Sequence, residues 1–214
     1  MFSFFSSFEK KTVRSGGRSR CGSLLLPIPV YKNTAADDRR ASRRYVRVRS
    51  RRVFTGLKHQ CVELARRWCV RAHNTTFEEV DNASDLMSLR RGKCIVCDKP
   101  VRLDVGPIST SRWGSGVDVR RGDLLVWKRG RPGPYRKTGH VAVVVKTGAN
   151  GTSTAPDATA MMISIAEQNG TTRNGHRALA LNGRTRRALA GRVRVYPHTH
   201  HTHHPHHPHH PHHK

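Results

Sequence analysis

One helical pattern precedes a series of strand-like segments, and this order limits the fold more than any other feature of the sequence. Residues 61–71 (CVELARRWCVR) place apolar side chains on one helix face, and Glu63 and Arg67 are expected to form an i,i+4 ion pair on the solvent-facing side. Four short apolar segments downstream have the length and composition of strands: residues 124–127, 140–146, 161–167 and 192–196. A helix followed by several strands predicts an α+β domain.

Weaker patterns add two further elements. Residues 82–89 (NASDLMSL) predict a second, short helix. Residues 23–31 (SLLLPIPVY) are apolar but interrupted by proline, which predicts an edge strand or a packed entry segment. A loop joins the segments 140–146 and 161–167, so we expect them to pair antiparallel, with the start of the first opposite the end of the second.

Composition indicates where the domain begins and ends. Hydrophobic residues make up 36% of the 214, below the roughly 45–50% of globular chains, so part of the sequence is not expected to form core. No apolar run reaches the roughly 18–20 residues of a membrane span, and we expect no membrane contact. We predict a disordered basic segment, a single domain and a disordered His/Pro-rich tail, at residues 1–22, 23–197 and 198–214.

The charge of +26 is uneven, and eight arginines fall within residues 37–52, which we interpret as an Arg-rich insertion in the domain. A second irregular segment, 147–160, is rich in Gly, Ser, Thr and Ala and is expected to be a flexible loop. An Arg-rich run can neutralise phosphates. Because 30 of the 40 basic residues are Arg and are spread along the chain, a general compositional bias explains the run as well. A nucleic-acid partner is therefore disfavoured but stays open, and an inactive scaffold that binds polyanions through this arm is the alternative function.

Three residues point to nucleophilic chemistry. Cys61 begins the helical pattern, where the helix N-terminus favours the thiolate, the reactive form of cysteine. His140 opens a buried strand directly after Gly139, whose missing side chain allows a close approach. Glu167 ends an otherwise apolar strand, where a carboxylate is costly unless it is used or solvated. The antiparallel pairing would bring His140 near Glu167, so a Cys–His–Glu group is expected; core packing of each residue is the alternative.

The other thiols and histidines give weaker signals. Cys69 lies about two turns into the helix and is expected to be a packing residue. Cys94 and Cys97 form a CxxC pair, which is half of a zinc site without a matching second pair. The tail 198–214 holds 11 histidines that suit Ni, Cu or Zn, with a repeat expansion or a purification tag as the alternatives. We expect no cofactor and assign no metal ligand.

Four segments occur in a recognisable order: GLKHQCVELARRW (56–68), GDLLVW (122–127), TGHVAVV (138–144) and IAEQNG (165–170). Together they resemble the CHAP amidase domain, within the subgroup of glutathionylspermidine amidase and D-alanyl-glycyl endopeptidase-like proteins. The resemblance covers about residues 23–197. It implies a papain-like (NlpC/P60-type) α+β fold, in which an N-terminal helix carrying the cysteine packs on an antiparallel sheet.

The resemblance also implies residue roles. Cys61 matches the family's nucleophile, His140 its general base and acid, and Glu167 the acid that orients the histidine. Other positions match residues that bind substrate, support the site or line the groove: Gln60, Arg66, Val80, Asp81, Asn82, Ala83 and Asn169. Gln60 or the Cys61 backbone N–H would be the oxyanion donor.

The implied reaction is hydrolysis of an amide bond in a small peptide or peptide–polyamine conjugate, through a thioester, by a monomer. His59 stands where the subgroup usually has an aromatic residue, and the loop 147–160 is longer than expected. These departures leave the substrate open between D-Ala-Gly peptides and glutathionyl-polyamine amides. Thiols not organised into a disulfide framework favour a cytoplasmic location, while the Arg- and Ser-rich N-terminus leaves mitochondrial targeting open.

Overall fold

The computed structural model describes residues 29–31, 42–108, 118–148, 161–169 and 175–196. Several sequence predictions fall outside these residues: the segment 1–22, the tail 198–214, residues 23–28 of the entry segment and residues 149–160 of the loop. The described end of the entry segment, Tyr31 included, belongs to no strand.

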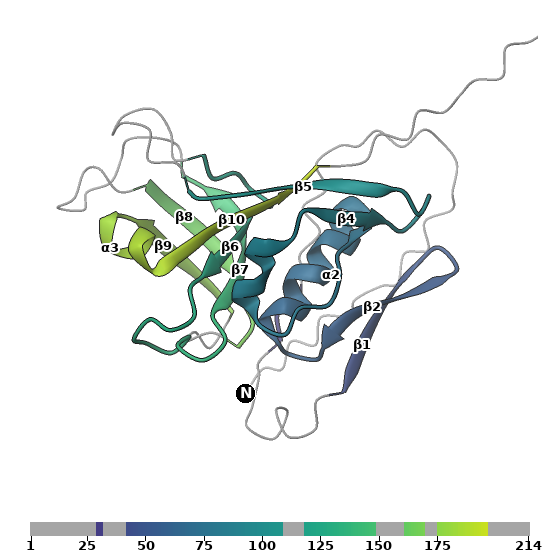
Figure 1. The fold of residues 1–214 in the computed structure, drawn as a ribbon, viewed down its shortest axis with the longest axis horizontal. Helices are drawn as coiled ribbons and strands as arrows, with labels where there is room; N and C mark the ends of the chain where they lie inside the picture. Colours follow the sequence, from purple (N-terminus) through teal and green to yellow (C-terminus); the bar gives the residue numbers. More distant parts are fainter. Residues whose placement is uncertain (1–28, 32–41, 109–117, 149–160, 170–174, 197–214) are drawn as a thin grey trace, which may run out of the picture.

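An eight-stranded antiparallel sheet is the central feature of the fold (Figure 1). Its strands lie in the order β3–β4–β5–β10–β6–β7–β8–β9, and each neighbouring pair is antiparallel. Their bounds are Thr75–Thr76 (β3), Arg91–Cys94 (β4), Pro100–Gly106 (β5), Leu124–Trp127 (β6), His140–Thr147 (β7), Met161–Ala166 (β8), His176–Leu181 (β9) and Leu189–Val195 (β10). A separate two-stranded hairpin is formed by β1 (Arg43–Val48) and β2 (Arg51–Leu57).

The long helix α2 (Cys61–His73) lies between the sheet and the β1–β2 hairpin, and it contacts β7 on one side and β2 on the other (Figure 1). A 3-10 helix, η1 (Ala83–Ser88), contacts β6 and β10, and the short helix α3 (Gly183–Ala188) precedes β10. No helix in the described part of the chain is long and apolar enough to cross a membrane.

Both faces of strand β7 are buried, which explains its continuous apolar sequence. Val141 and Val143 pack in the cluster that contains Leu64 of α2. The alternate residues, Ala142 and Val144, pack in a second cluster built largely from β6, β8 and β9. The sheet therefore separates two cores, and the start of β7 lies beside the start of α2.

The four predicted strands are confirmed as β6, β7, β8 and β10, and the expected antiparallel pairing of β7 with β8 is observed. The helix predicted at 61–71 is α2, and the one predicted at 82–89 is the 3-10 helix η1. One antiparallel sheet with few helices is compatible with the predicted α+β class. The described part of the Arg-rich insertion, residues 42–52, forms β1, the turn after it and the start of β2.

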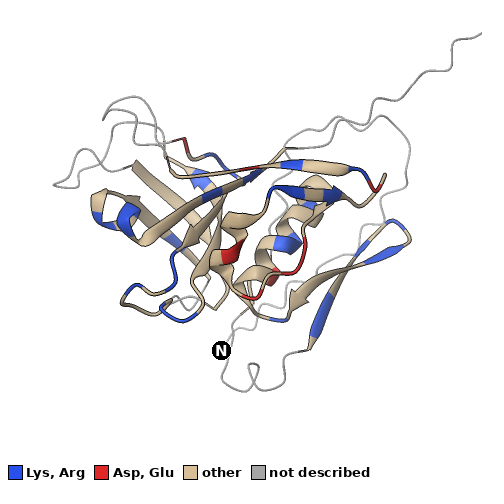
Figure 2. Ribbon diagram, viewed as in Figure 1, with Lys and Arg blue, Asp and Glu red and all other residues tan. Residues whose placement is uncertain are grey.

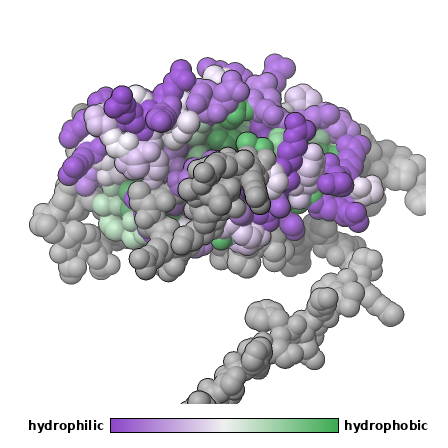
Figure 3. Space-filling model, turned by 90° about the horizontal axis from the view of Figure 1, so that it is seen from below, coloured by the Kyte–Doolittle hydropathy of each residue, from purple (hydrophilic) through white to green (hydrophobic). Residues whose placement is uncertain are grey.

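Charge and hydropathy are distributed unevenly over the surface. Lys and Arg occur on most elements, whereas Asp and Glu are fewer and several lie in and before η1 (Figure 2). On the face seen from below, hydrophilic residues surround a smaller area of hydrophobic ones (Figure 3). The basic composition is therefore carried mainly by the surface of the domain.

The prediction that the Glu63–Arg67 pair on α2 faces solvent is wrong. Glu63 and Arg67 do form the i,i+4 ion pair, at 2.8 Å, but their side chains are only 0% and 3% exposed. The β1–β2 hairpin packs over this side of α2, and Thr55 of β2 donates a hydrogen bond to Glu63 at 3.0 Å. Gln168 donates to the same carboxylate at 3.1 Å, so the buried charge is fully surrounded by donors.

We predict that Glu63→Ala destabilises the fold by about 3–5 kcal/mol, because it leaves the Arg67 guanidinium buried without its carboxylate. Urea unfolding followed by tryptophan fluorescence would measure the effect. The exposed Glu78 provides the control, and Glu78→Ala should unfold at the wild-type midpoint. Equal midpoints for all three proteins would contradict a stabilising role for the buried pair.

Candidate active site

Cys61 is the first residue of α2 and is 8% exposed. The residue before it, Gln60, has extended backbone angles, and no side chain caps the first turn of the helix. The Gln60 carbonyl accepts the first intrahelical bond, from Leu64 N at 3.2 Å, and a second bond from Gln168 Nε2 at 3.1 Å. The thiol is therefore fixed at a helix N-terminus, where the backbone favours negative charge.

His140 begins β7 and is 1% exposed. Its Nε2 lies 3.0 Å from Glu167 Oε2. The Tyr135 ring stacks on the imidazole with centroids 4.1 Å apart and planes 5° apart, and Trp127 approaches from 5.4 Å. The Tyr135 and Trp127 rings therefore hold the His140 imidazole in a fixed orientation.

Gly139 makes this position of His140 possible. Its φ of +69° lies in the left-handed region, and a Cβ there would be 2.5 Å from the Trp127 carbonyl oxygen and 3.2 Å from Ser84 N. The close approach expected from the missing side chain is therefore confirmed, and backbone of β6 and η1 is what approaches.

Three groups hold the Glu167 carboxylate. Besides His140, Arg177 of β9 donates from Nε to Oε1 at 2.9 Å, and the Tyr135 hydroxyl lies 3.5 Å from Oε2. Arg177 reaches the carboxylate because it pairs with Ile165 in the β8–β9 register, near the end of β8. Sequence reasoning missed Tyr135 and Arg177, since nothing in the pattern distinguishes this arginine from the others.

The thiol and the carboxylate both act on the titration of His140. Burial lowers the pKa of the imidazole, but hydrogen bonds to Cys61 and Glu167 and the charges of both outweigh burial, so the net shift is upward. Burial raises the pKa of Glu167, but its hydrogen bonds to His140 and Arg177 reverse the effect and leave the pKa below its ordinary value. The site therefore favours an imidazolium beside a carboxylate.

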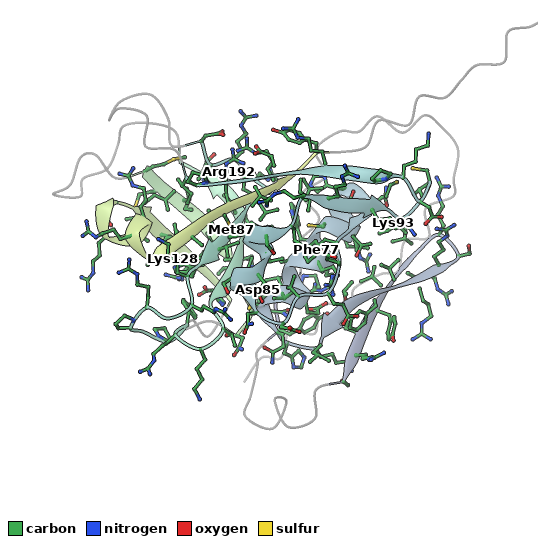
Figure 4. The ribbon with its side chains drawn as sticks, viewed as in Figure 1. Phe77, Asp85, Met87, Lys93, Lys128 and Arg192 are labelled. Carbon is green, nitrogen blue, oxygen red and sulfur yellow. The ribbon has the colours of Figure 1, made fainter. Side chains whose placement is uncertain are left out.

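A cavity of about 460 Å³ opens above this group. Eight of the sequence-predicted site residues line it: Gln60, Cys61, Arg66, Val80, Asp81, Ala83, His140 and Asn169. Glu167 does not line the cavity, because it lies behind the imidazole. Asn82 does not line it either; its backbone and side-chain N–H groups both donate to Asp85 at the start of η1. Figure 4 shows Asp85 on η1 in front of the sheet.

Gln60 and Asn169 meet at the cavity mouth. Asn169 Nδ2 donates to Gln60 Oε1 at 3.2 Å, and Asn169 has a positive φ of 55°. The neighbouring Gln168 was missed by sequence reasoning. It is buried and accepts bonds from Arg67 at 2.8 Å and from the Tyr31 backbone at 3.1 Å, so it joins the end of β8 to the start of α2.

Arg66 forms part of the cavity wall. It is 3% exposed, and its guanidinium donates to the Glu78 carbonyl at 2.7 Å. The same group lies 4.8 Å from the centre of the Phe77 ring and 5.8 Å from that of Phe54. Burial lowers its pKa, although Glu79 counteracts the shift. Arg66 is therefore held rigidly and offers a fixed positive charge to the cavity.

The other thiols in the described part of the chain, Cys69, Cys94 and Cys97, do not line the cavity. Cys69 is fully buried in the helix, as expected for a packing residue. Cys94 and Cys97 are hydrogen-bonded to each other in the turn between β4 and β5. Within the described ranges, no group of three or more His, Cys, Asp or Glu side chains is placed to hold a metal ion.

A cysteine at a helix N-terminus, beside a histidine that is oriented by a carboxylate, is the arrangement typical of thiol-dependent hydrolases. The CHAP domain family model matches residues 52–169, more than half of the chain, and the chain belongs to this family. The match includes the cysteine, the histidine and the glutamate described above.

The chain is also similar to the bifunctional glutathionylspermidine synthetase/amidase of Escherichia coli (strain K12) and to that of Shigella flexneri. Each is 33% identical over 116 residues, which is 54% of this chain but only 16% of the relative. Together with the family match, this supports a hydrolase that acts on amides.

We predict that the stability gap between the wild type and Glu167→Gln is widest between pH 4.5 and 6.5. The raised pKa of His140 contributes stability that is complete below its ordinary 6.5 and is lost as the pH rises through the folded value. The lowered pKa of Glu167 contributes stability that is complete above its ordinary 4.5 and is lost as the pH falls through the folded value. Thermal unfolding across pH 3–9 measures the gap, and a gap independent of pH would contradict the coupling.

Proposed function

We propose that the protein is a cysteine-dependent amidohydrolase with a papain-like (NlpC/P60-type) arrangement of its catalytic group. One observation carries the proposal: Cys61, at the start of α2, lines the same cavity as His140, whose Nε2 lies 3.0 Å from Glu167 Oε2 and whose pKa both Cys61 and Glu167 raise. The family match and the amidase relatives support the same reaction class.

The proposed reaction has two half-reactions: acylation of Cys61 and hydrolysis of the resulting thioester. His140 takes the thiol proton, or rests with Cys61 as an ion pair, and the thiolate attacks the amide carbonyl carbon. The carbon–sulfur bond forms, and the oxyanion accepts hydrogen bonds from the Cys61 backbone N–H and the Gln60 side chain. His140 then protonates the amine, which leaves as the C–N bond breaks. In the second half-reaction His140 takes a proton from water, the hydroxide attacks the thioester carbon, and the C–S bond breaks. The carboxylic acid leaves, and Cys61 and His140 return to the thiolate–imidazolium pair or the neutral thiol and imidazole.

Glu167 is proposed to orient the imidazole and to stabilise its charged form. Because Nε2 is occupied by Glu167, Nδ1 is the nitrogen that serves Cys61. The Arg177 guanidinium holds the carboxylate from behind, and Tyr135 covers the ring. The orienting group is thus rigid before substrate arrives.

The charges around the cavity favour a substrate with an acidic part and a cationic amine part. The lining carries both signs of charge: Arg43 and Arg66 are positive and Glu79 and Asp81 negative, and Glu79 is near enough to Arg66 to act on its pKa. In a chain of net charge +26 this acidic segment is a local exception, and Figure 2 shows acidic residues before η1 in front of α2. A peptide joined to a polyamine has both kinds of charge, so we propose that class, with D-Ala-Gly peptides as the alternative.

The proposed mechanism requires a reduced thiol, and a reducing compartment keeps thiols in this form. We therefore propose a cytoplasmic location. We also propose that the enzyme is a monomer.

Alkylation by iodoacetamide tests the nucleophile without any assumption about substrate. Cys61 should react rapidly below pH 8 and slow down in His140→Ala, as measured by peptide mass spectrometry. Cys69 is the internal control, because burial raises its pKa to about 12. An ordinary or unreactive Cys61 would refute the proposal and favour an inactive scaffold.

On a responsive amide substrate, Cys61→Ala should abolish turnover, and Glu167→Gln should reduce it less than His140→Ala does.

We predict that Glu79→Gln combined with Asp81→Asn raises KM about three- to tenfold for an amide with a cationic amine, since the double variant removes two attractive charges. A neutral leaving group of the same size should show an unchanged KM. Glu78→Gln is the matched control, because its side chain lies outside the cavity. An equal effect on both substrates would argue against recognition of the amine's charge.

A further inference from the structure

The β1–β2 hairpin has two faces of opposite character. Its inner face packs on the domain: Val46 and Val53 belong to a small apolar cluster with Val70 of α2 and Ile95. The outer face carries alternate residues of the same two strands, and Tyr45 on it is 40% exposed. Since the inner face is covered by the domain, the hairpin presents one flat face rather than a projecting ribbon.

The outer face concentrates positive charge without acidic partners. Arg47 of β1 and Arg52 of β2 are direct cross-strand neighbours, an arrangement that destabilises a hairpin. The sequence contains no Asp or Glu between residues 39 and 62, and Figure 2 shows blue on both strands of the hairpin. Among the described residues, the ion pairs of the hairpin are those of Arg44 and Arg51, both outside the Arg47–Arg52 pair.

Two arginines flank two adjacent aromatic rings on this face, in a row of contacts that we call the stack. The Arg52 guanidinium lies 4.6 Å from the centre of the Tyr45 ring, and the Tyr45 and Phe54 rings are 5.5 Å apart. Arg43 then lies 5.6 Å from the Phe54 ring. The stack ends at the catalytic cavity, which Arg43 and Phe54 also line.

A hollow of about 660 Å³ runs along strand β1 beside the stack. Its lining is basic and aromatic, with no acidic residue: Tyr31, Ser42, Arg43, Arg44, Tyr45, Val46, Arg47, Arg52, Lys58 and His59. Because residues 42–47 all line it, the hollow borders both faces of β1 and offers positive charge along a path beside the stack.

We propose that the outer face of the β1–β2 hairpin binds single-stranded nucleic acid, with arginines on the phosphates and Tyr45 and Arg52 as stacking surfaces for bases. Compositional bias accounts for many arginines, but not for a face whose described residues include no acid and place arginines at both ends of an aromatic pair. A duplex is disfavoured because the ribbon cannot enter a groove with its inner face covered. An anionic membrane is disfavoured because the apolar part of the stack is a single pair of rings with an arginine at each end, which is little apolar area to insert. The proposal is independent of amide hydrolysis.

The charge-reversal variant Arg47→Glu tests the proposal. A carboxylate at position 47 would face Arg52 and replace cross-strand repulsion by attraction, so the thermal midpoint should rise by about 1–3 °C. The same change should weaken binding of a fluorescent oligothymidylate of about 12 nucleotides by about tenfold. The slope of log K against log salt should become shallower by about 0.7 for each phosphate that the variant no longer neutralises.

Arg184→Glu is the matched control, because Arg184 is exposed on α3, at the opposite end of the molecule from the hairpin (Figure 1), and the change in net charge is identical. It should weaken binding less than twofold, as measured by fluorescence anisotropy of the full chain at fixed salt. Tyr45→Ala should weaken binding about tenfold without flattening the salt slope. Amidase activity should be unchanged in all three variants, since none of the three residues lines the catalytic cavity.

Equal weakening by Arg47→Glu and Arg184→Glu would show that only net charge matters and would overturn the proposal. It would equally be overturned by tighter binding to a duplex of the same length, or by binding to phosphatidylserine vesicles without binding to the oligonucleotide. If Arg47→Glu fails to fold, Arg47→Gln replaces it with the same expected order of affinities.

Discussion

The buried Glu63 carboxylate is the interaction on which the rest of the structure depends. It lies on the inner side of α2 and accepts bonds from Thr55 of the hairpin, Arg67 of the same helix and Gln168 at the end of β8. Gln168 in turn holds the Gln60 carbonyl. A charge in this position is costly unless every partner is present, so the network fixes three separate parts of the chain relative to one another. The network thereby fixes the start of α2, which bears the Cys61 thiol, relative to the end of β8, which leads into Glu167.

A second constraint is electrostatic. His140 and Glu167 lie in a region nearly closed to solvent, where the interaction of opposite charges is stronger than in water and an isolated charge is less stable. Arg177 and Tyr135 reach the same carboxylate from β9 and from the segment before β7, so the acid is held from several directions. The arrangement is complete before any substrate binds, and the binding of a substrate need not assemble it.

The proximity of Cys61, His140 and Glu167 could be predicted because their elements are simple: the helical pattern positions Cys61, and one antiparallel pairing brings His140 near Glu167. The supporting residues could not. Arg177 acquires its contact from the β8–β9 register, which the sequence does not specify, and it is one of 30 arginines. The solvent exposure expected for Glu63 was wrong for a related reason. The Arg-rich segment that covers it has no apolar run to mark it as packed structure, and yet it forms a hairpin over the helix.

Strand β9 is the last strand of the sheet in the described structure, and such a strand offers unpaired backbone groups to any other chain. A charged side chain that points inward from an outer strand is one way in which proteins avoid this association. Arg177 is such a residue, since it turns from β9 toward Glu167. One arginine therefore serves two ends: it steadies the carboxylate behind the histidine, and it makes the open edge of the sheet a poor template for self-association. A substitution at position 177 would therefore change both the support of the Glu167 carboxylate and the protection of this edge.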